Sequence, residues 1–273
     1  MNNIVIQLIC PDQKGIIAKL TSILYKSNNN ILSIEQHVDK ENKKFYIRIL
    51  IEFDSEKNLF PKSQLIDLNE NLSGKLNFFD LNEKIKVAIL GTKESEPIYD
   101  LLIKNQSNQL GCNIPAIISN HKKLSSVAEQ FNIDFFKINN NDELLKIIKD
   151  KKIDLIVLAR YMQIIPNDIV KLYKNNIINI HHGFLPAFKG ARPYHQAYKK
   201  GVKIIGATSH YVTNNLDEGP IITQDTVKIN HHHSINDMIQ LGREIEKNVL
   251  YNAVKAHLEY KIIVYNNKTI VFK

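Results

Sequence analysis

Between residues 85 and 180, short apolar runs alternate with segments in which apolar residues recur at helical spacing. Residues 85–90 (Ile-Lys-Val-Ala-Ile-Leu) predict a strand, 97–107 a helix and 114–118 the next strand. The run 154–159 (Asp-Leu-Ile-Val-Leu-Ala) is apolar after its first residue, as expected of a strand covered on both faces. Strands that alternate with helices form parallel βαβ units with right-handed crossovers. This pattern therefore predicts a parallel sheet enclosed by helices.

The same reasoning extends to the remaining elements of this region. Further helices are predicted at 123–131, 142–150 and 166–174, and further strands at 153–158 and 176–180. A loop rich in Gly, Pro, His and aromatic residues then runs to Pro193. Beyond it, the patterns predict strands near 203–212 and 221–229, a long helix with Ser234 as N-cap and Asp237 three residues later, and a hairpin of 261–265 with 269–272.

The first eighty residues follow a different pattern. Strands are predicted at 3–9, 31–38, 45–53 and 76–81, and helices at 16–28 and after Pro61. The order β-α-β-β-α-β is that of a ferredoxin-like domain. We therefore expect an α/β protein with two domains: a ferredoxin-like domain over residues 1–82 and a Rossmann-like, mostly parallel sheet over 83–273.

Composition restricts the class of protein. The 273 residues are 44% hydrophobic and 23% charged, which is typical of globular proteins. No window approaches the roughly 20 apolar residues of a membrane helix, and the N-terminus reads as a strand and not as a signal peptide. Cys10 and Cys112 match no metal or redox spacing and are expected to be free thiols in the cytoplasm. The net charge of +8 is dispersed along the chain, so we expect no nucleic-acid partner.

The side chains best suited to catalysis lie between residues 176 and 220. Asn179 and His181 stand two apart at the end of a predicted strand, so both should project to one face. A later turn, 215–220, carries two carboxylates, Asp217 and Glu218. An amide, an imidazole and a carboxylate suit acyl transfer, because they can stabilise an oxyanion, move a proton and activate water. The three histidines 231–233 cannot all face one ion, and we interpret them as a solvated approach to Ser234.

At these residues the sequence resembles a known family. Asn179-Ile-His181, Leu185-Pro186 and Leu216-Asp217-x-Gly219-Pro220 resemble the catalytic signature of formyltransferases that use 10-formyltetrahydrofolate. The stretch 181–197 is similar to formyltetrahydrofolate deformylases in particular, as are 159–164, 204–210 and 242–250. Near the N-terminus, Asp12-x-x-Gly15-Ile, Asn30-Ile31, Gln36-His37 and 45–48 resemble the ACT domain that this hydrolase carries.

The resemblance implies roles for residues that match the family's motifs. It implies catalysis by Asn179, His181 and Asp217. It implies a folate pocket formed by Met162, Gln163, Ile164, Ile165, His210, Thr213, Asn214, Asn215 and Leu216. In the ACT domain it implies an effector site for a small amino acid at Asp12, Gly15, Asn30 and Ile31, for which a plain strand-to-helix turn is the alternative interpretation.

Two departures from the family's pattern bear on the reaction. Gly183 stands where deformylases usually carry serine, and Glu96-Pro97 stand where they often carry His-Cys. Glycinamide ribonucleotide formyltransferase, another enzyme with this signature, has a Gly-Ser-rich loop at the place of residues 91–97 of this chain. The backbone amides of such a loop bind a phosphate. Here the loop carries Lys and Glu and lacks the repeated glycines, which favours water over a phosphorylated acceptor.

The resemblance thus implies hydrolysis of 10-formyltetrahydrofolate to tetrahydrofolate and formate, supplying formate for purine biosynthesis and balancing one-carbon folate pools. It implies no cofactor and no metal, a folate substrate, an amino-acid effector, and a homo-oligomer that is a dimer of dimers or larger. Two alternatives stay open: formyl transfer to glycinamide ribonucleotide or another amine, and an amino-acid-sensing regulator with an inactive catalytic domain.

Overall fold

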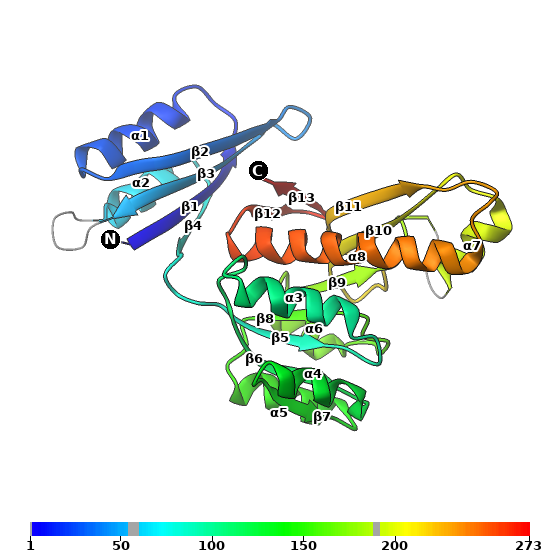
Figure 1. Ribbon diagram of the computed structural model, residues 1–273. Coiled ribbons are helices and arrows are strands. Elements are labelled where there is room, and N and C mark those ends of the chain that lie inside the picture. Colours follow the sequence, from blue (N-terminus) through cyan, green and yellow to red (C-terminus); the bar gives the residue numbers. More distant parts are fainter. Residues whose placement is uncertain (1, 54–59, 188–191) are drawn as a thin grey trace. The chain divides into compact units, whose positions relative to one another are not determined.

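The computed structural model describes residues 2–53, 60–187 and 192–273 (Figure 1). The chain divides into two compact units. One runs to Lys84 and also contains Glu259–Ile263 and Ile270–Lys273, and the other comprises Ile85–Leu258 and Val264–Thr269. Residues 188–191 of the deformylase-like stretch lie outside the described residues. Within the described segments, no helix combines the length and apolar composition that crossing a membrane requires.

The first unit has the predicted β-α-β-β-α-β order. Its elements are β1 (Asn2–Pro11), α1 (Ile16–Lys26), β2 (Asn30–Asp39), β3 (Lys44–Phe53), α2 (Lys62–Asn71) and β4 (Lys75–Asp80). The strands form one antiparallel sheet in the order β2-β3-β1-β4. The buried stripes of both helices, such as Leu20 and Leu65, pack with the sheet residues Ile6 and Ile47 in one hydrophobic core.

The C-terminal residues belong to this unit because buried polar groups of its sheet bind their backbone. Arg48 is only 3% exposed, and its guanidinium donates to the Tyr260 carbonyl (3.1 Å) and the Glu259 carbonyl (2.9 Å). The Gln7 amide donates to the Tyr260 carbonyl at 2.8 Å, and the Phe79 ring stacks on the Tyr260 ring. These contacts satisfy polar groups that the sheet core would otherwise leave unpaired.

The second unit is built on a seven-stranded sheet in the order β11-β10-β9-β8-β5-β6-β7. The five neighbouring strands β9, β8, β5, β6 and β7 are parallel to one another, whereas β10 runs antiparallel to both β9 and β11. This confirms the predicted mostly parallel sheet. From β5 to β9, strands alternate with helices along the chain. The elements are β5 (Lys86–Leu90), α3 (Glu96–Gln106), β6 (Asn113–Ser119), a 3-10 turn (Lys122–Leu124), α4 (Ser125–Gln130), β7 (Asp134–Lys137), α5 (Asn141–Asp150), β8 (Leu155–Leu158), α6 (Asn167–Leu172) and β9 (Ile177–His181).

The chain then continues through α7 (Pro193–Lys200), β10 (Ile204–Tyr211), β11 (Ile221–Lys228) and α8 (Ile235–Leu258), and ends in the hairpin β12 (Ile262–Tyr265) and β13 (Lys268–Val271). Helix α8 packs on β9, β10 and β11 (Figure 1). It begins with the predicted capping box: the Asp237 amide donates to Ser234 Oγ (3.2 Å), and the Ser234 amide donates to Asp237 Oδ2 (2.8 Å).

Two elements were not predicted from the sequence. Strand β7 has only four residues (Asp-Phe-Phe-Lys), and its pairing with β6, such as Ile118 with Phe136, is what makes it a strand. Helix α7 lies between the predicted loop, which ends at Pro193, and the strand predicted near 203, in a segment for which no element was predicted. It has Pro193 at its first position, buries Tyr194 and Ala197 at helical spacing, and ends at Gly201 with φ of 62°. These helix signals are local, but they directly follow a Gly- and Pro-rich loop, which makes the start of the helix hard to recognise in the sequence.

Candidate active site

The pairing of β9 with β10 places two polar side chains side by side at the sheet edge. Asn179 lies opposite His210, and Asn179 Nδ2 is 3.2 Å from His210 Nε2. His210 is 2% exposed, and its Nδ1 donates to the Tyr211 carbonyl at 2.9 Å. Because a carbonyl only accepts, this bond puts the proton of the neutral ring on Nδ1 and leaves Nε2 to accept from the Asn179 amide. Burial lowers the pKa of His210, which favours this neutral form.

A tight turn brings Asp217 to the same place. Asp217 has φ of 55°, and its Oδ2 is 3.3 Å from Nδ1 of the buried His181, while its Oδ1 is 3.8 Å from His210 Nε2. The turn packs this closely because residue 219 is glycine: a Cβ there would lie 1.7 Å from the Tyr211 carbonyl oxygen. The structure therefore gathers Asn179, His181 and Asp217, the three side chains predicted from the family's signature.

A cavity of about 150 Å³ adjoins these groups. Most of the predicted folate residues line it: Gln163, Ile164, Ile165, His210, Thr213, Asn214, Asn215 and Leu216. Asn179 and Asp217 also reach its wall, so the cavity opens directly onto the polar cluster. Met162 is the exception, because it is not among the lining residues and its side chain is 56% exposed.

Some residues of this site were missed from the sequence. Leu158, Tyr161 and Val212 add apolar wall to the cavity. Thr92, after β5, supports the loop that follows β8, because the Met162 amide donates to its Oγ1 at 2.9 Å. The parallel pairing of β5 with β8 signals that their carboxyl ends meet, but a single threonine carries no recognisable motif.

A second missed group supports the loop after His181. Thr208 is fully buried and lies opposite His181. Its hydroxyl accepts from the Leu185 amide (3.1 Å) and from Gln224 Nε2 (2.9 Å), and it donates to the Gly183 carbonyl (2.9 Å). Gln224 also donates to the Leu185 carbonyl at 2.9 Å. The chain leaving the site thus has a defined path, since each of these buried groups is paired.

The lowered pKa of His210 leads to a prediction for stability. The folded state resists protonation at Nε2, whereas the unfolded chain binds that proton near pH 6.5. Stability from this group is therefore present above pH 6.5 and is lost as pH falls, since the unfolded state then binds more protons. In urea unfolding between pH 7 and 5, His210→Gln should flatten the decline by up to about 1.4 kcal/mol per pH unit. His231 is exposed, so His231→Gln should leave the dependence of the unfolding free energy on pH as in the wild type. The same dependence in His210→Gln as in the wild type would contradict the assignment of His210 as a buried, neutral histidine.

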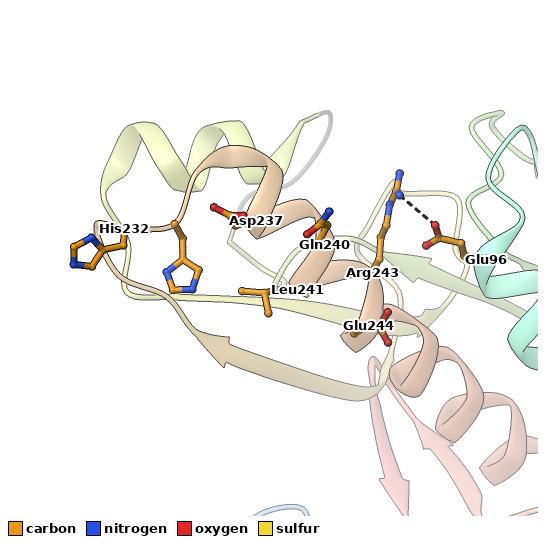
Figure 2. A pocket seen from close by; sticks show the side chains of 8 residues that line it. Glu96, His232, Asp237, Gln240, Leu241, Arg243 and Glu244 are labelled. Carbon is orange, nitrogen blue, oxygen red and sulfur yellow. Dashed lines mark hydrogen bonds and ion pairs between the residues drawn. The ribbon is translucent and has the colours of Figure 1, made fainter.

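A larger cavity lies elsewhere in this unit, lined by Glu96, His232, His233, Asp237, Gln240, Leu241, Arg243 and Glu244 (Figure 2). Figure 2 shows Arg243 turned toward Glu96, with which it forms an ion pair of 3.2 Å. His233 Nδ1 bonds to Asn230 Oδ1 at 2.9 Å, and Asp237 Oδ2 accepts from the Ser234 amide at 2.8 Å, so both side chains have structural partners. Within residues 2–53, 60–187 and 192–273, no three His, Cys, Asp or Glu side chains are grouped to hold a metal.

The predicted effector residues of the first unit do not meet within one chain. Asp12 and Gly15 lie in the turn after β1, where the Asp12 amide donates to the Lys43 carbonyl at one end of β3. Asn30 and Ile31 begin β2 and pair with Glu52 and Ile51 at the other end of β3. At about 3.4 Å per residue, the two pairs are separated by roughly the length of the strand.

Comparison with known proteins adds independent evidence. Residues 85–254 match the formyl transferase family, and residues 4–59 match the ACT domain. A formyltetrahydrofolate deformylase of Synechocystis is 42% identical, with both chains covered completely. That of Escherichia coli is also 42% identical, over 98% of this chain and 97% of the relative. The crystal structure of a formyltetrahydrofolate deformylase from Pseudomonas syringae superposes with a TM-score of 0.95 at 38% identity, covering 100% of this chain and 95% of that one. With its whole length matched in sequence and in fold, this chain belongs to the formyltetrahydrofolate deformylase family.

Proposed function

We propose that this protein hydrolyses 10-formyltetrahydrofolate to tetrahydrofolate and formate. The observation that carries the proposal is the convergence of Asn179, His181 and Asp217 at the mouth of the 150 Å³ cavity. The curated relatives that match the chain over its full length carry the same activity in their names.

In the proposed reaction the pterin occupies the cavity and the formyl group lies between Asn179 and His181. Asp217 and His181 position a water molecule and remove its proton as the oxygen bonds to the formyl carbon. The Asn179 amide carries two protons; one is donated to His210, and the other is free to stabilise the oxyanion together with a proton donated by His181. The bond from the formyl carbon to N10 then breaks, N10 takes up a proton, and formate and tetrahydrofolate leave.

An amine acceptor is the alternative within the same fold, and the loop before α3 disfavours it. Arg243 on α8 pairs with Glu94 (3.3 Å) and Glu96 (3.2 Å), so this cation is already bound to two carboxylates of the protein. Two carboxylates at this place would repel the phosphate of glycinamide ribonucleotide.

The deciding experiment measures formate release from 10-formyltetrahydrofolate without any amine. We expect stoichiometric formate and tetrahydrofolate, at a rate that glycinamide ribonucleotide does not raise. Formylated glycinamide ribonucleotide as the main product would establish a transferase instead. No turnover with either acceptor would favour a regulator with an inactive catalytic domain.

We further propose that the enzyme acts in the cytoplasm without a cofactor, as a homo-oligomer, supplying formate for purine biosynthesis. Its two cysteines are free and buried, which suits a reducing compartment. Because Asp12 and Asn30 lie at opposite ends of β3, an amino-acid effector that contacts both would need two ACT domains in antiparallel pairing. Formate release measured with and without candidate amino acids tests for such an effector.

A further inference from the structure

Tyr211, the last residue of β10, contacts two parts of the candidate active site through its backbone. Its carbonyl accepts from His210 Nδ1 at 2.9 Å, and its amide donates to the Pro220 carbonyl at 2.9 Å. The first bond fixes the ring that accepts from the Asn179 amide. The second ties the end of the turn that carries Asp217 to the sheet. The position of this one residue therefore bears on both the amide and the carboxylate of the site.

This end of β10 does not lie in a regular ladder of backbone bonds. The pairing of β10 with β11 shifts register between Ser209 and His210, so the strand carries an irregularity immediately before Tyr211. Such bulges re-aim neighbouring side chains. On the β9 side, the Val212 amide donates to the Ile177 carbonyl at 2.9 Å, and the chain then leaves the sheet. Side-chain contacts therefore contribute to fixing the direction of this strand end.

The Tyr211 side chain supplies such a contact, because it lies in the packing between β10 and α8. It is 2% exposed, and its Oη lies 2.8 Å from Nδ1 of His257 on α8. The two rings meet edge to face, with centroids 5.8 Å apart. Burial raises the pKa of Tyr211 and lowers the pKa of His257 to about 4, so both groups are neutral at pH 7. A hydrogen bond between neutral groups thus joins the strand to the helix without burying a charge.

The two side chains of this pair lie away from the substrate cavity. Successive side chains of a strand point to opposite faces, so His210 faces the polar cluster while Tyr211 faces α8. Neither Tyr211 nor His257 is among the residues that line the cavity of about 150 Å³. Any effect of the pair on the reaction therefore passes through the backbone of Tyr211, and it concerns the chemical step more than substrate affinity.

We propose that Tyr211 and His257 are positioning residues for the reaction. Their hydrogen bond fixes the end of β10, and the Tyr211 backbone passes that position on to the His210 ring, the Asn179 amide and the Asp217 turn. The inference rests on the proposed function, because the rate that it concerns is that of formate release. A displacement of about 1 Å at a catalytic group can lower a rate about 100-fold, so the loss of an anchor next to His210 has a measurable effect.

The test removes the hydrogen bond from each side and from both. Tyr211→Phe deletes only the hydroxyl, and His257→Phe replaces the imidazole with a ring that has no nitrogen. We expect kcat for formate release from 10-formyltetrahydrofolate to fall about tenfold in each variant, with little change in KM. The double variant should fall no further than the single variants, because either substitution already removes the whole bond. Effects that multiply in the double variant would show that the two side chains act independently and would overturn the proposal.

Tyr173→Phe is the matched control, and it separates positioning from a loss of stability. Tyr173 is another buried tyrosine of this unit, and its hydroxyl donates to the Ile153 carbonyl at 2.9 Å. Urea unfolding should show comparable losses of stability in Tyr173→Phe and Tyr211→Phe, since each variant removes one buried hydrogen bond. Only Tyr211→Phe should lose kcat. A Tyr211→Phe enzyme that is destabilised yet turns over as fast as Tyr173→Phe would reduce the pair to a structural contact.

A measurement without catalysis distinguishes this inference from the proposed function. In protein that contains isotope-labelled histidine, NMR follows the exchange of the His210 Nδ1 proton with water and so reports on its bond to the Tyr211 carbonyl. We expect this exchange to be about tenfold faster or more in Tyr211→Phe than in the wild type, because the strand end opens more often. An unchanged exchange rate would overturn the proposal. If the wild type releases no formate, the proposed function fails, whereas faster exchange in Tyr211→Phe would still support the anchoring of His210.

Discussion

Replacing His181 or Asn179 with alanine is expected to lower the rate of formate release about 100- to 1,000-fold, the usual cost of removing one oxyanion donor. His181 contacts Asp217 at 3.3 Å, and Asn179 is oriented by His210, so each variant deletes a group that is already positioned for the reaction. Folate affinity should change little, because the apolar wall of the cavity stays intact.

Stopped assays of formate release, together with equilibrium binding of tetrahydrofolate, separate these two effects. Asn179→Asp sharpens the test, because a carboxylate has nearly the same shape as the amide but cannot donate to an oxyanion while ionised. His231→Ala, on the exposed loop before α8, is the matched control and should keep full activity. Normal turnover in Asn179→Ala or in His181→Ala would refute the catalytic assignment.

The second large effect is expected for stability, in Glu246→Ala. Glu246 on α8 is 2% exposed and forms an ion pair with Arg160 (2.9 Å), and Tyr194 donates to its other oxygen at 2.7 Å. Burial raises the pKa of Glu246, and the nearby Arg160 and the Tyr194 hydrogen bond oppose that rise. Removing the carboxylate leaves the Arg160 cation, whose side chain is 11% exposed, without its partner, and the loss of one partner of a buried pair typically costs about 3–5 kcal/mol.

Urea unfolding of the variant measures this loss. Glu244→Ala is the matched control on the same helix: Glu244 is exposed and pairs with Lys247, so its loss should cost about 1 kcal/mol or less. The double variant Arg160→Met/Glu246→Met should be more stable than Glu246→Ala, because it removes both charges together. A loss in Glu246→Ala no larger than that in Glu244→Ala would show that Arg160 is not left uncompensated.

Much of the fold followed from local patterns. The apolar run at 154–159 predicted a strand buried on both faces, and Leu155–Leu158 is fully interior in the sheet. Ser234 and Asp237 predicted the start of α8, because a capping box depends only on residues three apart. Strand β7 escaped prediction because a four-residue segment owes its conformation to the neighbouring strand.

For the candidate site, the two-residue period of a strand placed Asn179 and His181 on one face, and the resemblance to formyltransferases added Asp217. The sequence by itself thus determined the order of the elements and the residue types available for chemistry, since both depend on short-range periodicity and motif. Only the tertiary structure decided that Gly219 lets the Asp217 turn approach Tyr211, that Glu246 meets Arg160, and that Asp12 and Asn30 lie apart. Those relations join residues distant in the chain, and close packing of the folded elements sets them.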